Sequence, residues 1–216
     1  MKQPPNGIAS SVDEAMKVSE EVGFPLVVRP SDVLGGRAME VVYKKTDLEN
    51  YLIEAVQASA KSPVLLDGFL NQAIEMDIEA VCDGKEVVIG GILQHIEQAG
   101  IHSGDSACSL PPYNLEEDLI QDITLMVKKI ALEIGAIGLV NVQLAYYDNE
   151  LYLLEVNPRA SRTIPFVSKC IGRSLAKVGA LCMVGISLEE QNYKDAIVPE
   201  YFSVKEAVFP LSLIHI

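Results

Sequence analysis

The sequence has few of the residues that build disulfide scaffolds or soft-metal centres. Only three histidines occur, at His95, His102 and His215. The four cysteines are widely spaced and form no CxxC pair: Cys82, Cys108, Cys170 and Cys182. This usage argues against a disulfide framework, a zinc site and a histidine-rich metal centre. We therefore expect the cysteines to fill the core of a cytoplasmic protein.

Positive charge and long apolar runs are also scarce. Lys and Arg total 17 against 30 Asp and Glu, which gives a formal net charge of −13. A chain of this charge repels polyanions, so nucleic-acid binding is not expected, and any phosphate site must be local. No apolar run approaches the ~20 residues of a membrane span, and no signal-peptide pattern stands at the start.

What remains is a globular composition with a mixed pattern of helices and strands. The chain has 216 residues, of which 49% are hydrophobic and 22% charged, enough for one large domain or two small ones. Capping boxes at Ser11 and Thr46 predict helices over residues 11–22 and 46–60. Between them, residues 24–43 are predicted to form a hairpin with a glycine loop at its tip.

The second half continues the mixture without a regular βαβ rhythm. Residues 74–82 alternate strictly, with Glu75, Asp77 and Glu79 on one face, which we interpret as a solvated strand face. His95 is expected to be a hydrogen-bonded core histidine in the next strand. The remaining segments are predicted as a long loop over 97–114, a helix over 119–134, two strands around the turn 148–150, and a helix over 174–184. The fold class is therefore expected to be α+β.

The stretch "LLEVNPRASRTIPF" places a carboxylate, an amide and two arginines at the end of an apolar strand. If the preceding hairpin has a three-residue loop, Gln143 pairs with Glu155 and Asn141 with Asn157 on one sheet face. A two-residue loop would put Gln143 on the opposite face. Oxygen ligands that converge in this way suit Mg²⁺, and the two arginines could meet phosphoryl or carboxyl oxygens in fork geometry.

Four stretches in this order and spacing resemble the ATP-grasp domain of the carbamoyl phosphate synthetase large subunit. They are "VVRPSDVLGGRAMEVVY", "HIEQAGIHSGDSACSLP", "NVQLA" and "LLEVNPRASRTIPFVSK". The resemblance covers residues 2 to about 210, and it is stronger to the carboxyl-terminal half, which phosphorylates carbamate, than to the half that phosphorylates bicarbonate. It implies two α+β subdomains with mainly antiparallel sheets that clasp a nucleotide between them.

The resemblance also implies a role for each matching residue. Arg29 would contact ATP phosphates under a loop with Gly35 and Gly36. The adenine and ribose would meet Gly68, Leu70 and Glu75. The neighbouring wall of the nucleotide pocket would comprise Gly100, Ile101, His102 and Ser103. Metal ions would be held by Gln143, Glu155 and Asn157. Catalysis would fall to Arg159, Arg162 and Asn157, with Arg159 and Arg162 stabilising the transferred group.

Cofactors and partners follow from the same resemblance. The chain would use ATP with Mg²⁺ or Mn²⁺, two ions per ATP site, in the synthesis of carbamoyl phosphate for arginine and pyrimidine biosynthesis. Its partners would be the remainder of the large subunit and a glutamine amidotransferase small subunit, or a second copy of the fragment. Residues 1–70 would be a lid subdomain, 71–185 the larger subdomain with the metal site, and 186–216 a trailing segment.

Two alternatives stay open. One is a different ATP-grasp ligase, such as a biotin-dependent carboxylase component, although the runs "HSGDSACSLP" and "NPRASRTIPF" argue against it. The other is a fragment that binds nucleotide, or merely packs against partners, without turnover. The second is favoured by the final "LSLIHI", which does not resemble the family and is typical of a truncation or a non-native tail.

Overall fold

The chain divides into two compact units, residues 1–72 and 73–216, which are described separately. The computed structural model describes residues 1–31, 39–58, 63–101 and 105–207, and it describes the side chains of all of these but 54–58. The predicted glycine loop at Gly35 and Gly36 and the "LSLIHI" tail therefore lie outside the described residues.

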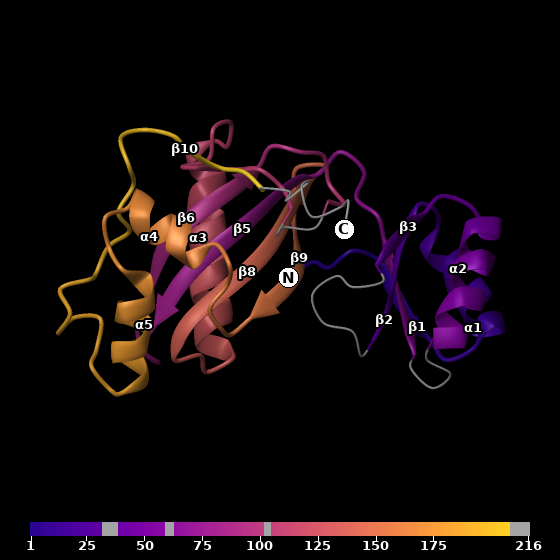
Figure 1. Ribbon diagram of the computed structural model, residues 1–216, viewed down its shortest axis with the longest axis horizontal. Coiled ribbons are helices and arrows are strands. Elements are labelled where there is room, and N and C mark those ends of the chain that lie inside the picture. The colour runs from indigo at the N-terminus through magenta and orange to yellow at the C-terminus, as the bar shows by residue number, and fades with distance from the viewer. Residues whose placement is uncertain (32–38, 59–62, 102–104, 208–216) are drawn as a thin grey trace, which may run out of the picture. The chain divides into compact units, whose positions relative to one another are not determined.

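The first unit is a four-stranded sheet with two helices (Figure 1). The strand order is β1-β4-β2-β3, and all paired neighbours are antiparallel. The elements are β1 (Asn6–Ala9), α1 (Val12–Val22), β2 (Leu26–Pro30), β3 (Glu40–Val42), α2 (Lys45–Ala58) and β4 (Val64–Gly68). The predicted hairpin is confirmed as the antiparallel pair of β2 and β3, whereas β1 was not predicted.

Helix α1 begins as its capping box predicts. Ser11 is the N-cap and its side chain accepts a hydrogen bond from the backbone N–H of Glu14 at 3.2 Å. Glu14 in turn accepts from the backbone N–H of Ser10 at 2.8 Å, so donors at the helix start are satisfied locally. The helix ends at Gly23, whose positive φ of 86° suits a residue without a side chain.

The second unit is a six-stranded antiparallel sheet covered by helices on both faces (Figure 1). The strand order is β10-β7-β6-β5-β8-β9. The strands are β5 (Ile74–Cys82), β6 (Val87–His95), β7 (Cys108–Leu110), β8 (Gly138–Tyr147), β9 (Glu150–Asn157) and β10 (Ser203–Lys205). The helices are α3 (Glu117–Glu133), α4 (Ile164–Cys170) and α5 (Leu175–Met183). The predicted loop over 97–114 is therefore partly wrong, because it contains the short strand β7.

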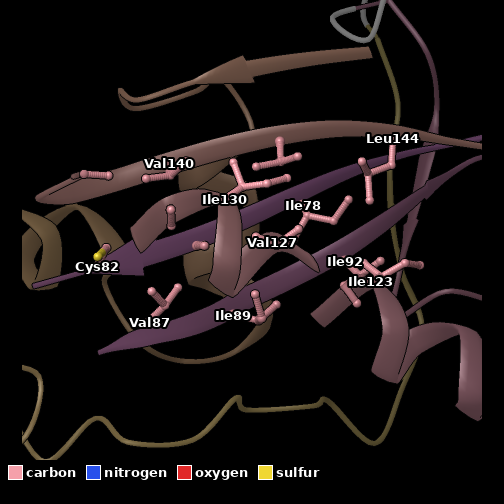
Figure 2. Close-up of a cluster of buried hydrophobic side chains, with 14 of the residues drawn as sticks. Ile78, Cys82, Val87, Ile89, Ile92, Ile123, Val127, Ile130, Val140 and Leu144 are labelled. Atoms are coloured by element: carbon pink, nitrogen blue, oxygen red, sulfur yellow. The ribbon is translucent and has the colours of Figure 1, made fainter. Parts of the chain in front are cut away.

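The core beside α3 is built from the apolar residues of the alternating strand β5. Figure 2 shows Ile78 and Cys82 among the side chains that α3 contributes, Ile123, Val127 and Ile130. A second apolar cluster on the other face joins Val81 and Val88 to residues of α4 and α5. Both faces of the sheet are thus buried, and polar side chains on β5 need partners within the protein.

Among the residues that the structure describes, none of the helices has the length and apolar character that a membrane crossing requires.

Candidate functional site

The hairpin of β8 and β9 brings the predicted metal ligands to one face of the sheet. Gln143 pairs with Glu155, and Asn141 pairs with Asn157, as predicted. The predicted three-residue loop is wrong, because Tyr147 pairs with Glu150 across a two-residue turn. A β-bulge between Gln143 and Leu144 shifts the register by one residue and restores the pairing.

The turn and the bulge have separate causes. Asp148 and Asn149 both have positive φ, 51° and 60°, a conformation that short hairpins require and that these residue types tolerate. The bulge leaves Leu154 without a facing residue, between the pairs Leu144 with Leu153 and Gln143 with Glu155. Together they place an amide and a carboxylate opposite each other near the end of β9.

The residues at this strand end fit a divalent cation that prefers oxygen ligands. Gln143, Glu155 and Asn157 are half-buried, so their side chains are neither sealed in the core nor fully solvated. They offer amide and carboxylate oxygens without sulfur or imidazole, which is the donor set typical of Mg²⁺.

The two arginines of the stretch "LLEVNPRASRTIPF" come shortly after the end of β9. The guanidinium of Arg159 donates to Asn157 Oδ1 at 3.2 Å and to the carbonyl oxygen of Ala160 at 3.0 Å. Arg159 and Arg162 are both exposed. A guanidinium carries five N–H donors, so Arg159 can be anchored to its own loop and still bind an anion.

The polar face of β5 is buried, contrary to the prediction. Asp77 is 2% exposed and Glu79 is fully buried. Asn141, on the neighbouring strand β8, donates to Asp77 Oδ1 at 3.2 Å and to Glu79 Oε1 at 2.9 Å. The expectation of a solvated face failed because partners from distant parts of the chain cover these carboxylates.

His95 lies between the carboxylates of Asp77 and Glu75 and is the hydrogen-bonded core histidine that the sequence predicted. Its Nε2 is 2.9 Å from Asp77 Oδ2 and its Nδ1 is 3.4 Å from Glu75 Oε2. Burial alone would lower the pKa of His95, but contacts with Asp77, Cys108 and Glu75 raise it to about 11. The ring is therefore a buried imidazolium that offsets the negative charge of its neighbours.

Asp77, His95 and Cys108 also form the one cluster among the described residues with the spacing of a metal site. Both ring nitrogens of His95 face carboxylates, however, and a protonated imidazole has no lone pair for a metal. All four cysteines are free and buried, as expected of core residues.

We predict that the His95 ring stays doubly protonated at pH 8 to 9. Because its pKa is raised to about 11, its contribution to stability is complete below about pH 6.5 and is lost as the pH rises toward 11. Imidazole NMR shifts across this range provide the measurement. Titration of the His95 ring near pH 6.5 would contradict the assignment, and His95→Gln should remove this part of the pH dependence of unfolding.

In the first unit, the predicted phosphate and adenine contacts lie on two paired strands. Arg29 on β2 is 3.5 Å from the carboxylate of Asp67 on β4, measured from Nε to Oδ2. Burial raises the pKa of Asp67, and the charge of Arg29 opposes that rise. The N–H of Gly68 donates to the carbonyl oxygen of Pro5 at 2.7 Å, so this N–H already has a partner. Leu70 follows β4 and is half-buried.

In the second unit, Glu75 is brought against the predicted pocket wall. Its Oε1 accepts a hydrogen bond from the backbone N–H of Gly100 at 3.0 Å, and Ile101 next in the chain is exposed. His102 and Ser103 lie outside the described residues. The residue predicted to contact the ribose, Glu75, thus meets Gly100, the first residue of the predicted wall.

Sequence reasoning missed the buried polar contacts of the second unit, which join Asp77, Glu79, Asn141, Ser161 and Thr163. In the first unit it missed the ion pair of Asp67 with Arg29. Ser161 and Thr163 both donate to Glu79 Oε1 at 2.5 Å. The sequence held one sign of these contacts, namely that the hydroxyl residues Ser161 and Thr163 flank Arg162 in the stretch "LLEVNPRASRTIPF".

A family model described as "Carbamoyl-phosphate synthase L chain, ATP binding domain" matches residues 2–191. The carbamoyl phosphate synthase large chain of Pseudomonas syringae pv. tomato is 61% identical over 212 residues, which are 98% of this chain and 20% of that protein. The large chain of Neisseria meningitidis serogroup B is 60% identical over 97% of this chain. The chain thus spans about a fifth of the length of the curated relatives that it matches.

Solved structures at low sequence identity show the fold. A biotin carboxylase from Campylobacter jejuni, in complex with β,γ-ATP, has a TM-score of 0.79 at 19% identity and covers 94% of this chain and 46% of that one. The biotin carboxylase domain of Hydrogenobacter thermophilus 2-oxoglutarate carboxylase, in complex with MgADP, ADP and bicarbonate, has a TM-score of 0.77 at 22% identity, over 94% and 46% of the two chains.

These likenesses confirm the expected α+β ATP-grasp fold. Carbamoyl phosphate synthase large chains share about 60% sequence identity with this chain, whereas the biotin carboxylases share 19% to 22%. The alternative of a biotin-dependent carboxylase component is therefore not favoured. The chain belongs to the family of the carbamoyl-phosphate synthase L chain, ATP binding domain.

Proposed function

We propose that this chain binds Mg²⁺·ATP and phosphorylates carbamate, as the carboxyl-terminal ATP-grasp domain of a carbamoyl phosphate synthase large chain. The observation that carries the proposal is the pairing of Gln143 with Glu155 on the sheet face from which Asn157 contacts Arg159. An oxygen-ligand cluster thereby adjoins a guanidinium that can bind phosphoryl oxygens.

The nucleotide contacts that we propose are given for each unit separately. In the first unit, Arg29 would contact ATP phosphates together with the loop at Gly35 and Gly36, and main-chain groups near Gly68 and Leu70 would line the adenine. In the second unit, Glu75 would hold the ribose, and residues 100–103 would form the neighbouring wall of the pocket.

Phosphoryl transfer in this site needs positioning and charge neutralisation from the protein, with little covalent chemistry. A carbamate oxygen attacks the γ-phosphorus in line, the bond from that phosphorus to the β,γ-bridging oxygen breaks, and carbamoyl phosphate and ADP result. Gln143, Glu155 and Asn157 would hold Mg²⁺ or Mn²⁺, two ions per ATP, which when bound neutralise phosphate charge. Arg159 and Arg162 would stabilise the charge on the transferring group, and Ser106 and Cys108 need not act as nucleophiles.

The assembly proposed for this chain is the remainder of the large subunit together with a glutamine amidotransferase small subunit, in arginine and pyrimidine biosynthesis in the cytoplasm. Exposed apolar residues on the edge strand β10 and in the segment before it support a covering partner there. They are Val198, Tyr201, Phe202 and Val204, each at least 59% exposed. A second copy of the chain is the alternative occupant of this edge.

A nucleotide titration paired with a reverse assay tests the proposal. We expect ATP to bind only weakly without Mg²⁺, and the chain to form ATP from ADP and carbamoyl phosphate. Acetyl phosphate serves as the control acyl phosphate and should not support ATP formation. ATP formation from acetyl phosphate instead would favour another ligase, and Mg²⁺-dependent binding without turnover would favour a fragment that binds nucleotide only.

A further inference from the structure

Glu79 lies at the centre of β5 and makes an unusual set of contacts. The residue is fully buried, and one oxygen, Oε1, accepts from Asn141 at 2.9 Å and from Ser161 and Thr163 at 2.5 Å each. The other oxygen, Oε2, is buried and has no hydrogen-bond partner among the described residues. A buried carboxyl group is costly to retain, so three donors on one oxygen call for a physical reason.

The hydroxyl donors come from the segment that carries the two arginines. Ser161 and Thr163 stand on either side of Arg162, between the end of β9 and the start of α4. Their hydroxyl oxygens are 2.6 Å apart, and the backbone N–H of Thr163 donates to Ser161 Oγ at 3.0 Å. Glu79 thus fixes the chain on both sides of Arg162.

Asn141, the third donor, connects Glu79 to the other arginine. While its amide nitrogen donates to Glu79, its Oδ1 accepts from Asn157 Nδ2 at 3.4 Å. Asn157 Oδ1 then accepts from the guanidinium of Arg159 at 3.2 Å. The hydrogen-bonded path therefore runs from Glu79 through two amides to Arg159.

The Thr163 side chain binds Glu79 and does not stabilise the start of α4. Thr163 is the N-cap residue of α4, yet its side chain makes no capping hydrogen bond. An N-cap threonine usually stabilises its helix by accepting from a backbone N–H. Here the hydroxyl donates to Glu79 instead. The contact therefore fixes the segment that carries Arg159 and Arg162, and it leaves the start of α4 without a side-chain cap.

Resting on the function proposed above, we infer that Glu79 is a positioning residue that holds the segment 158–163 so that Arg159 and Arg162 meet the transferring phosphoryl group. The role requires an acceptor oxygen in the place of Oε1 and no proton transfer by Glu79. Glutamine can supply that oxygen, whereas alanine cannot.

The test compares Glu79→Gln, Glu79→Ala and Thr163→Val in the reverse assay. We expect Glu79→Ala and Thr163→Val to lower kcat for ATP formation by roughly 10- to 100-fold, with the KM for MgADP changed by less than about threefold, since misplacement of charge costs rate more than ground-state binding. Glu79→Gln should stay within about threefold of the parent chain. Ser109→Ala is the matched control, because the Ser109 hydroxyl lies on β7 and donates to the carbonyl oxygen of Pro111, the residue that follows this strand.

Two results in this assay would overturn the inference. If Glu79→Gln is as slow as Glu79→Ala, Glu79 takes part in the chemistry itself. If Thr163→Val and Glu79→Ala both keep the parent kcat, the segment is not held by this carboxyl group. Should Glu79→Ala fail to fold, Thr163→Val decides, because it keeps the shape of the side chain and removes only the hydroxyl.

Hydrogen exchange of the amides of residues 159–163 separates this inference from the proposed function. Faster exchange in Thr163→Val, and not in Ser109→Ala, supports the anchoring role even if the parent chain shows no turnover. Unchanged exchange in this segment would overturn it. Absence of turnover in the parent chain, by contrast, would count against the proposed function alone.

Discussion

Replacement of Glu155 by glutamine is expected to weaken Mg²⁺-dependent ATP binding by roughly 10- to 100-fold. Glu155 is the carboxylate among the three proposed ligands, and glutamine keeps its size while removing the charge that neutralises a divalent cation. Calorimetric titration of ATP with Mg²⁺ and with a chelator gives the metal-dependent part of the affinity.

Glu150→Gln is the matched control for this change. Glu150 lies at the other end of β9, where it accepts from the hydroxyl of Tyr152 at 3.2 Å. Its replacement removes the same charge from the same strand and should leave the metal dependence intact. An unchanged Mg²⁺·ATP affinity in Glu155→Gln would show that the metal assignment is wrong.

Arg159→Ala is expected to reduce kcat by about 10² to 10³, with nucleotide affinity nearly unchanged. The reason is that a guanidinium next to the transferring group stabilises charge that spreads over the phosphoryl oxygens in the transition state. Arg159→Lys keeps the charge and loses the fork geometry, so its kcat should lie between those of the parent chain and the alanine variant. Steady-state kinetics of the reverse assay provide both parameters.

Lys129→Ala is the control that tests whether the loss of any exposed positive charge lowers kcat, since Lys129 is an exposed residue of α3. This variant should behave as the parent chain does. If Arg159→Ala instead raises the KM for MgADP with kcat unchanged, the arginine contributes ground-state binding, and its proposed catalytic role is wrong.

The hairpin of β8 and β9 was predicted from the sequence only in part. The facing pairs Gln143 with Glu155 and Asn141 with Asn157 were predicted, but from a loop that is one residue too long. The residue types of Asp148 and Asn149 favour a two-residue turn. The consecutive leucines at 153 and 154, which interrupt the alternation of the strand, mark the bulge that was overlooked.

The buried carboxylates could not be predicted in the same way. Alternation in β5 identifies the two faces correctly, since Met76, Ile78 and Ala80 are in the core beside α3. It does not reveal that the polar face is covered, because the donors to Glu79 are separated from it by 62 to 84 residues. The local pattern of apolar and polar residues indicates which side chains share a face of the strand, whereas the burial of that face depends on tertiary contacts.

Several short strands and one short helix were also not predicted from the sequence. Strands β1, β7 and β10 have three or four residues each and α4 has seven, too few for a periodic signal. The α4 omission matters for the proposed function, because Thr163 stands at the N-cap position of this helix, although its hydroxyl contacts Glu79 and makes no capping hydrogen bond. The family resemblance supplied the proposed roles of the arginines, but not the contacts that hold them.

Paramagnetic NMR with Mn²⁺ in place of Mg²⁺ tests the central claim most directly, namely that Gln143, Glu155 and Asn157 hold the metal of the metal–nucleotide complex. With ATP and Mn²⁺ present, the side-chain amide signals of Gln143 and Asn157 should broaden strongly. The amide of Asn149, six residues or about 20 Å further along the hairpin, should remain sharp. Broadening that spares Gln143 and Asn157 would contradict the proposed site.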